Sequence, residues 1–364
     1  MSLEIGIVGL PNVGKSTLFS ALTKRQVDIN NYPFCTISPN TGFVNVLDER
    51  LDKLWTLHPQ SNKINSVAKF VDIAGLVKNA HQGEGLGNQF LSQIRGVNVI
   101  VEVVRAFADP NIIHTEKRID PLADIEIVRS ELILSDLELL LKRKERIAKE
   151  KRSPGKEGEE AEIEGEIIET FLEKLNREEW LWPTPKFPGA KEQKAKEICK
   201  NFSLLTAKPI IYAVNIEDTR DTKDLLAKFT QKGIREEEIV FLDVKLEKEL
   251  SEMSEEEKKE MGLKGNLENL VRRSYDLLGT LTFFTSGEKE TRAWTTRKGA
   301  LAPEAAGVIH SDFEKKFICA SVINWQKLLG AKSWKDAKQS GLVRTEGKEY
   351  EMREGDVVEF LVGK

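Results

Sequence analysis

Nine residues near the N-terminus have the types and the spacing needed to hold a triphosphate. They run Gly9-Leu10-Pro11-Asn12-Val13-Gly14-Lys15-Ser16-Thr17 and fit the pattern G-x-x-x-x-G-K-[ST]. The two glycines allow backbone conformations that turn successive N–H groups toward one anion. Lys15 is expected to reach the β- and γ-phosphates, and the Ser16 hydroxyl to bind Mg²⁺. The predicted nucleotide contacts are Gly9, Asn12, Val13, Gly14, Lys15, Ser16 and Thr17.

The flanking residues predict the elements that must present this segment. An apolar run at residues 5–8 predicts a buried strand before it, and residues 18–22 begin a helix after it. The helix would point its N-terminal dipole and unpaired amides at the same anion. A glycine-rich turn that carries a lysine by chance is the alternative, and the complete pattern with both flanks argues against it.

A loop and a strand further along the chain supply candidate ligands for the metal ion. Residues 30–40 contain two prolines and four asparagines or serines, which predicts a loop. Thr36 is the candidate Mg²⁺ ligand there, although an ordinary surface threonine fits these residues equally well. Residues 67–75 predict a strand that ends in D-x-x-G. Asp72 would hold a water on Mg²⁺ at its end.

The last residue of this segment, Gly75, and the residue after it, Leu76, bear on hydrolysis. The Gly75 amide is expected to meet the γ-phosphate. Leu76 follows it at the place where Ras-like enzymes carry the glutamine that orients the attacking water. The usual catalytic side chain is therefore missing from the usual place.

The predicted base-recognition segment is only partly of the guanine-reading type. A strand at residues 208–214 ends at Asn215-Ile216-Glu217-Asp218, where GTPases carry N-K-x-D. Ile216 replaces the lysine, and Asp243-Val244-Lys245 replaces the S-A-K of guanine-specific enzymes. A lone carboxylate does not clearly select adenine, which offers a donor at N6 and an acceptor at N1. We expect Asn215, Ile216 and Asp218 to meet the base.

Residues 120–200 predict a helical insertion within the nucleotide domain. Residues 142–152 are strongly basic, Pro154-Gly155 breaks the helix, and residues 157–169 carry seven glutamates and no basic residue. Opposite charges on two arms predict an antiparallel hairpin with electrostatic pairing. The charged faces are either solvated structural surfaces or, on the basic arm, contacts for ribosomal RNA phosphates.

The composition changes again at residue 281. Strands are predicted at residues 282–285, 292–295 and 355–362, and a helix is predicted to carry Phe313 and Phe317. We therefore predict a nucleotide domain over residues 1–280 and a small α+β domain over residues 281–364.

Length and composition exclude several classes of protein. A chain of 364 residues suggests two or three domains, and a net charge of −4 leaves nucleic-acid contacts to local patches. No apolar run approaches a membrane span, and the first strand begins too early for a signal peptide. Three widely spaced cysteines predict a reducing compartment, so we expect a cytoplasmic protein. The four histidines form no pair with metal-ligand spacing, so Mg²⁺ is the only expected divalent ion.

Together these motifs resemble the YchF/Obg-like ATPase family over essentially the whole chain. The motifs that carry the resemblance are residues 9–17, Asn-Tyr-Pro-Phe-Cys-Thr-Ile (31–37), Asp-Ile-Ala-Gly-Leu-Val-Lys (72–78), Asn-Ile-Ile-His (111–114) and Gly-Asp-Val-Val-Glu-Phe (355–360). The resemblance implies an α/β, Ras-like P-loop domain of the TRAFAC class with an inserted helical coiled-coil hairpin. It also implies a C-terminal α+β TGS domain of β-grasp fold.

The resemblance also implies roles for single residues. A hydrophobic residue replaces the catalytic glutamine in that family, as Leu76 does here, and His114 occupies the place of a histidine implicated in hydrolysis. His81 is a second candidate, and a loop histidine that only packs is the structural alternative. Asn12 matches an asparagine that looks like a K⁺ ligand in related enzymes. Asp218 departs from the family's usual glutamate, and the backbone at Ile216 is implied to meet the base.

The expected function is that of a Mg²⁺-dependent ATPase that also binds GTP and acts as a slow, ribosome-associated switch. The expected partner is the large ribosomal subunit or the 70S ribosome, bound through the helical insertion, the TGS domain or both, by a monomer with no membrane contact. A GTP-specific ribosome-assembly GTPase is one alternative. A nucleotide-gated RNA- or ribosome-binding regulator with negligible hydrolysis is the other.

Overall fold

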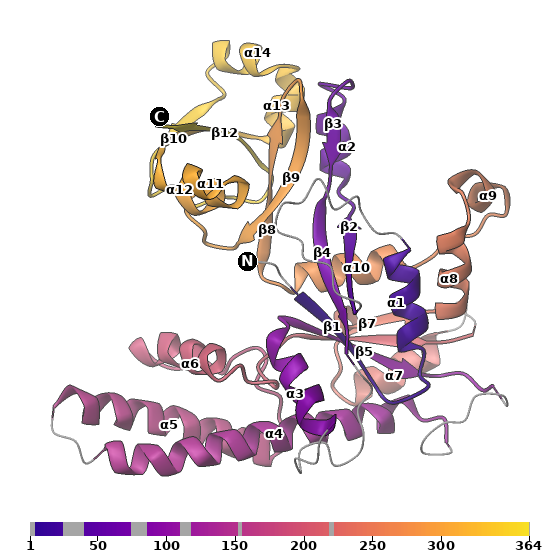
Figure 1. Cartoon of the computed structure of the whole chain (residues 1–364), viewed down its shortest axis with the longest axis vertical. Coiled ribbons are helices and arrows are strands. Elements are labelled where there is room, and N and C mark those ends of the chain that lie inside the picture. The colour runs from indigo at the N-terminus through magenta and orange to yellow at the C-terminus, as the bar shows by residue number, and fades with distance from the viewer. Residues whose placement is uncertain are drawn as a thin grey trace. The chain divides into compact units, whose positions relative to one another are not determined.

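Two six-stranded sheets, each with its own helices, make up the part of the chain that the structure describes (Figure 1). The computed structural model describes residues 4–24, 40–73, 86–109, 118–151, 155–217 and 222–363. The contacts divide these residues into two compact units. The first holds residues 4–42 and 69–274 as far as they are described, and the second holds residues 43–68 and 275–363.

The first sheet is built mostly from parallel strands. Its strands are, in spatial order, β2 (Thr41–Val46), β4 (Ser66–Asp72), β1 (Glu4–Val8), β5 (Val99–Arg105), β6 (Ile210–Asn215) and β7 (Ile239–Leu242). Of these, β4, β1, β5, β6 and β7 each run parallel to the next. Ile5 of β1 lies beside Phe70 of β4 on one side and Val99 of β5 on the other. The strands β1, β5 and β6 are mostly apolar and almost completely buried, because parallel strands are covered on both faces. Parallel pairing places the carboxyl ends of β1, β5, β6 and β7 at one edge.

Helices connect the strands of the first unit in the order typical of an α/β fold, with three successive helices after β5 and three after β7. They are α1 (Lys15–Thr23), α3 (Leu86–Gly96), α4 (Pro121–Glu150), α5 (Lys156–Asn176), α6 (Ala190–Asn201), α7 (Lys223–Gln231), α8 (Val244–Glu252), α9 (Glu255–Glu260) and α10 (Leu267–Asp276), the last of which ends two residues inside the second unit. Among the helices of the described residues, none is long and apolar enough to cross a membrane. The predicted α/β nucleotide fold is confirmed.

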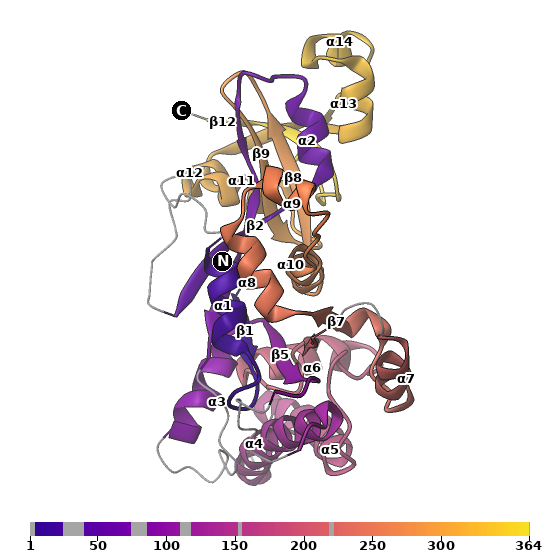
Figure 2. The ribbon, with the colours of Figure 1, turned by 90° about the vertical axis from the view of Figure 1, so that its right-hand side faces the viewer.

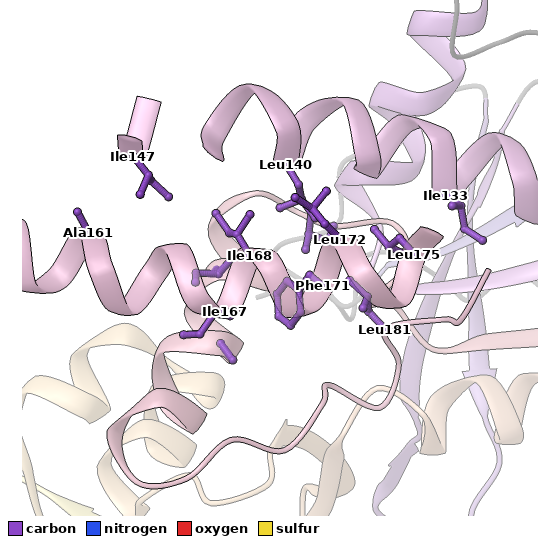
Figure 3. Close-up of a cluster of buried hydrophobic side chains, with 13 residues drawn as sticks. Ile133, Leu140, Ile147, Ala161, Ile167, Ile168, Phe171, Leu172, Leu175 and Leu181 are labelled. Atoms are coloured by element: carbon purple, nitrogen blue, oxygen red, sulfur yellow. The ribbon is translucent and has the colours of Figure 1, made fainter. Parts of the chain in front are cut away.

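The predicted helical hairpin is confirmed, and α4 and α5 run side by side in both views (Figures 1 and 2). Asp120 begins α4 by accepting a hydrogen bond from the Ala123 amide, with Pro121 in the first turn. Figure 3 shows Leu140 of α4 directed at Leu172 of α5 in a buried apolar seam. The helix α6, which the sequence did not predict separately, contributes Ala195 and Ile198 to the same cluster.

Charge pairing between the two arms is also confirmed. Arg143 Nε lies 2.7 Å from Glu164 Oε1, and Lys144 Nζ lies 2.7 Å from Glu169 Oε1. A third basic residue, Lys142, pairs within its own helix with Glu138 at 2.5 Å. The hairpin is therefore held by an apolar seam and by ion pairs along its edge.

The second unit is an α+β fold around a mixed sheet. Its strands are, in spatial order, β11 (Arg344–Glu346), β10 (Phe317–Asn324), β12 (Asp356–Val362), β8 (Thr280–Ser286), β9 (Glu290–Arg297) and β3 (Asn62–Ile64). Its helices are α2 (Glu49–Trp55), α11 (Ala302–Ile309), α12 (Ser311–Lys315), α13 (Trp325–Ala331) and α14 (Trp334–Gln339). Phe283 packs in a cluster with α11, and Phe284, on the opposite face of β8, packs in a cluster with α2 and α13.

Two details differ from the sequence-based prediction. Phe317 begins strand β10 rather than continuing a helix with Phe313, because α12 ends at Lys315 and the β-rich run Phe-Ile-Cys-Ala-Ser-Val-Ile follows. Residues 43–68 were predicted within the nucleotide domain; residues 43–46 and 66–68 belong to β2 and β4 of the first sheet, while the contacts of the segment as a whole group it with the C-terminal residues. The physical reason is that β3 pairs in parallel with β9 and that Leu51 and Leu54 of α2 pack under the C-terminal sheet.

Candidate nucleotide site

The phosphate loop has the backbone geometry that anion binding requires. Gly9, Asn12 and Gly14 have φ values of +143°, +62° and +108°, and α1 begins immediately afterwards at Lys15. A Cβ atom at Gly9 would collide with the Val103 carbonyl oxygen, and one at Gly14 would lie 2.6 Å from Asn215 Nδ2. No side chain of the described residues caps α1, so its first-turn amides are available to an anion.

Lys15 and Asp72 form the charged centre of the site. Lys15 is 9% exposed, and its Nζ donates to the Leu10 carbonyl oxygen at 2.7 Å. Burial lowers the pKa of Lys15 to about 8, while the charge of Asp72 acts in the opposite direction. Burial likewise raises the pKa of Asp72, and the Lys15 charge opposes that shift. A bound phosphate would compete with the Leu10 carbonyl for the ammonium group.

A cavity of about 850 Å³ opens beside this loop. Four loops contribute to it, and each follows the carboxyl end of β1, β5, β6 or β7, the edge where parallel sheets bind ligands. The lining residues are Asn12, Gly14, Lys15, Ser16, Thr17, Phe107, Ala108, Asp109, Asn215, Ile216, Glu217, Asp243, Val244 and Lys245. The structure thus brings the predicted phosphate loop and the predicted base segment to one cavity.

Asn215 joins the two halves of the cavity. Its Nδ2 donates to the Val13 carbonyl oxygen at 2.9 Å, and its Oδ1 accepts from the Val244 amide at 3.2 Å. The side chain therefore fixes the phosphate loop against the start of α8. Because both groups of the amide already bond the backbone, Asn215 is first a positioning residue for the loop.

Ile216 and Asp243 complete the base end of the cavity. The Ile216 amide donates to the Leu242 carbonyl oxygen at 2.9 Å, so this N–H is committed to the backbone. The Ile216 side chain is buried and lines the cavity. Asp243 Oδ1 accepts from the Leu246 amide at 2.9 Å and thereby caps α8. The Asp-Val-Lys that replaces S-A-K thus has a structural role in starting this helix.

Phe107, Ala108 and Asp109 are the cavity residues that sequence reasoning missed. Their only signal is position, because they directly follow the buried strand β5. Six predicted residues cannot be placed, because Thr36, Gly75, Leu76, His81, His114 and Asp218 lie outside the described residues. Their roles remain predictions.

The donor groups of the site suit Mg²⁺. The Ser16 hydroxyl lines the cavity at the start of α1, and the Asp72 carboxylate lies close enough to Lys15 for their charges to interact. Within the described residues no group of three or more histidine, cysteine or carboxylate side chains is arranged for a metal. Mg²⁺ in phosphate sites takes one or two protein oxygens and otherwise phosphate and water, so these two oxygens fit it.

Two family models match the chain. Residues 4–135 match a model described as 50S ribosome-binding GTPase. Residues 280–363 match the C-terminal model of YchF-type GTPases, which is described as a protein of unknown function.

Curated relatives match over their whole lengths. A Bacillus subtilis (strain 168) protein named ribosome-binding ATPase YchF is 44% identical over 370 residues, covering 99% of each chain. The Mycoplasma genitalium protein of that name is 46% identical and covers 98% of each chain. The solved structure of the Schizosaccharomyces pombe YchF GTPase is 36% identical, has a TM-score of 0.83, and covers 99% of this chain and 98% of its own.

Proposed function

This chain belongs to the YchF family, and from that premise we propose that it is a Mg²⁺-dependent ATPase that acts on the ribosome as a slow nucleotide switch. The observation that carries the proposal is the phosphate loop at the mouth of a cavity of about 850 Å³. Relatives that match end to end are named ribosome-binding ATPases, which supports both the activity and the partner.

Each phosphate contact has a residue to make it. The first-turn amides of α1 and the Lys15 ammonium bind the β- and γ-phosphates, and Ser16, Thr36 and Asp72 hold Mg²⁺ directly or through water. The metal, when bound, neutralises charge that develops on the phosphates. Asn12, whose φ of +62° places it in the left-handed region of the loop, is the proposed K⁺ ligand.

Slow hydrolysis follows from the residue that replaces glutamine. Leu76 has no group that can orient a water, so we assign that task to His114 and the γ-phosphate contact to the Gly75 amide. A switch with slow turnover holds its triphosphate state long enough to recruit a partner. Hydrolysis then resets it.

The base end of the cavity supports binding of both purines. Phe107 and Ile216 offer apolar contacts for a flat ring, and such contacts do not distinguish adenine from guanine. The absence of the N-K-x-D lysine favours ATP. Asp218 keeps a carboxylate at the guanine-reading position, which makes a GTP-specific enzyme the second candidate.

The ribosomal contact is proposed for the helical hairpin. Lys142, Arg143 and Lys144 are each engaged with a glutamate, so this basic run offers RNA less free charge than the sequence suggests. Arg146 and Lys194 make no ion pair within the described residues. They line a groove of about 260 Å³ between α4, α5 and α6, which is also lined by Arg143, Glu164 and Glu197. These two cations are the better candidates for phosphate contacts.

Calorimetry with ATP and GTP, in the presence of Mg²⁺ and K⁺, tests the nucleotide proposal. Tighter binding of ATP supports an ATPase, and tighter binding of GTP makes the chain a GTPase. His114→Ala is expected to abolish turnover and spare ATP binding. His81→Ala is the matched histidine control and should retain turnover. Intact turnover in His114→Ala would remove its catalytic role.

Co-sedimentation with 70S ribosomes at low salt tests the partner proposal. The double variant Arg146→Glu with Lys194→Glu is expected to weaken association, and Lys142→Glu with Lys144→Glu is the charge-matched control. Equal loss in both pairs would indicate a general charge effect rather than the groove. Unchanged association in both would move the contact to another surface.

A further inference from the structure

Arg105 is a fully buried arginine beside the nucleotide cavity. It is the last residue of β5 and is 1% exposed, and it lies next to Asn215 in the sheet register. Burying a guanidinium costs several kcal/mol unless its donors are satisfied. A charge kept at this position therefore calls for a specific set of partners.

Two of those partners, Phe107 and Asp109, belong to the cavity wall itself. Arg105 Nε donates to the Phe107 carbonyl oxygen at 3.0 Å, and Nη2 donates to the Asp109 carbonyl oxygen at 3.2 Å. The guanidinium carbon lies 4.6 Å from the centroid of the Phe107 ring. One side chain thus contacts two carbonyl groups and an aromatic ring within three consecutive residues.

The same loop is tied through the backbone to the neighbouring strand β6, which leads into the base segment. The Ala106 amide donates to the Asn215 carbonyl oxygen at 2.8 Å, and Ile216, the next residue, also lines the cavity. Phe107 is only partly buried because part of its surface lines the cavity. Its position is therefore set by its contacts with Arg105 and by the bond between Ala106 and β6.

We propose that Arg105 is a positioning residue for nucleotide binding, which holds Phe107 as the aromatic wall against which a purine base stacks. The inference rests on the proposed function, in which Phe107 contacts the base, and deepens it by assigning the placement of that ring to a buried cation. The Arg105 guanidinium and a stacked base would both interact with the π-system of the Phe107 ring. The wall acts on any purine and does not select between ATP and GTP.

If Arg105 has this role, removing it should weaken the binding of ligands that carry a base and leave the binding of the phosphates unchanged. Stacking of one base on one aromatic ring contributes a factor of about ten to a hundred in affinity. Arg105→Met keeps the length of the side chain and removes the guanidinium, so Phe107 loses its support. Phe107→Leu removes the ring and leaves Arg105 in place.

Calorimetry on the full chain with ATP, GTP and inorganic tripolyphosphate, each with Mg²⁺, separates base binding from phosphate binding. Arg105→Met and Phe107→Leu are each expected to weaken ATP and GTP about tenfold and to leave tripolyphosphate unchanged. The double variant is expected to bind ATP no more weakly than Phe107→Leu alone, because the arginine acts through the ring. Arg95→Met, a control at a partly buried arginine outside the cavity, should keep the wild-type ratio of ATP to tripolyphosphate affinity.

Three results would overturn the inference. These are wild-type ATP affinity in Arg105→Met, an equal loss of tripolyphosphate binding, or additive losses in the double variant. If thermal melts show that Arg105→Met is unfolded, Arg105→Lys decides the matter. It keeps the charge but not the fork of donors, and a several-fold loss of ATP without loss of tripolyphosphate is expected. Failure of the wild type to bind ATP or GTP would overturn the proposed function itself.

Discussion

Lys15 makes triphosphate binding depend on pH. Its pKa is lowered to about 8 by burial, and a phosphate group binds the charged ammonium. We expect the ATP affinity to fall as the pH rises through 8, because binding then requires uptake of a proton by Lys15. Calorimetry in two buffers of different ionisation enthalpy checks this, since the difference in observed heat between the buffers should grow as the pH rises through 8. A buffer-independent heat throughout would contradict it.

The same group affects the stability of the nucleotide-free protein. An unfolded lysine keeps its proton up to a pKa of 10.5, whereas the folded one releases it near 8. The unfolded state therefore binds more protons between these values, and the contribution of Lys15 to the free energy of unfolding rises with pH across that window. Lys15→Met should remove this rise together with most of the triphosphate affinity.

Asn215 gives a second prediction at the scale of single residues. Asn215→Ala removes the donor to the Val13 carbonyl oxygen and the acceptor for the Val244 amide. Leaving either backbone group buried without a partner costs about 1–3 kcal/mol. ATP, GTP and tripolyphosphate should all weaken, about tenfold or more, because the lost bonds hold the phosphate loop. Binding constants for the three ligands measure this. A loss limited to GTP would show instead that the amide reads the base.

At the scale of elements, the hairpin offers two ion pairs of different quality. Arg143 and Glu164 are 21% and 13% exposed and meet through two bonds of 2.7 and 3.0 Å. Lys144 and Glu169 are about half exposed. Arg143→Met should lower the free energy of unfolding by about 1 kcal/mol after allowance for solvent screening, and Lys144→Met should have a smaller effect. Urea unfolding at two salt concentrations tests the order, and equal losses would contradict it.

The elements that were predicted correctly are those that residues close together in the sequence determine. The phosphate loop follows from two glycines at positive φ, and the hairpin follows from apolar spacing with charge blocks of opposite sign. The strand β3 could not be predicted, because Asn62-Lys63-Ile64 has no strand signature and pairs with β9. Arg105 looked like the polar end of an apolar strand, since only the folded loop shows what its donors meet.

At the scale of the whole molecule, the assignment of residues 43–68 to the second unit can be tested. Leu54 of α2 is fully buried and packs in the cluster of Phe284, Ile323 and Val357. Leu54→Ala should lower the stability of the second unit by about 2–5 kcal/mol. Trp325 and Trp334 pack against this cluster, so tryptophan fluorescence during unfolding should report the loss. Leu47→Ala, at a residue that is 52% exposed, is the control. Equal midpoints in both variants would contradict the assignment.

The pairing of β3 with β9 also has a consequence for how the protein is made. Asn62 and Glu290 are about 230 residues apart, and translation adds about 5–20 residues per second. The apolar side of α2 therefore waits roughly 10–45 seconds for the strands that cover it. During synthesis this uncovered apolar face is prone to aggregation until the strands that cover it are made. A protein that we propose works on ribosomes thus completes its own C-terminal unit only when its own translation is nearly finished.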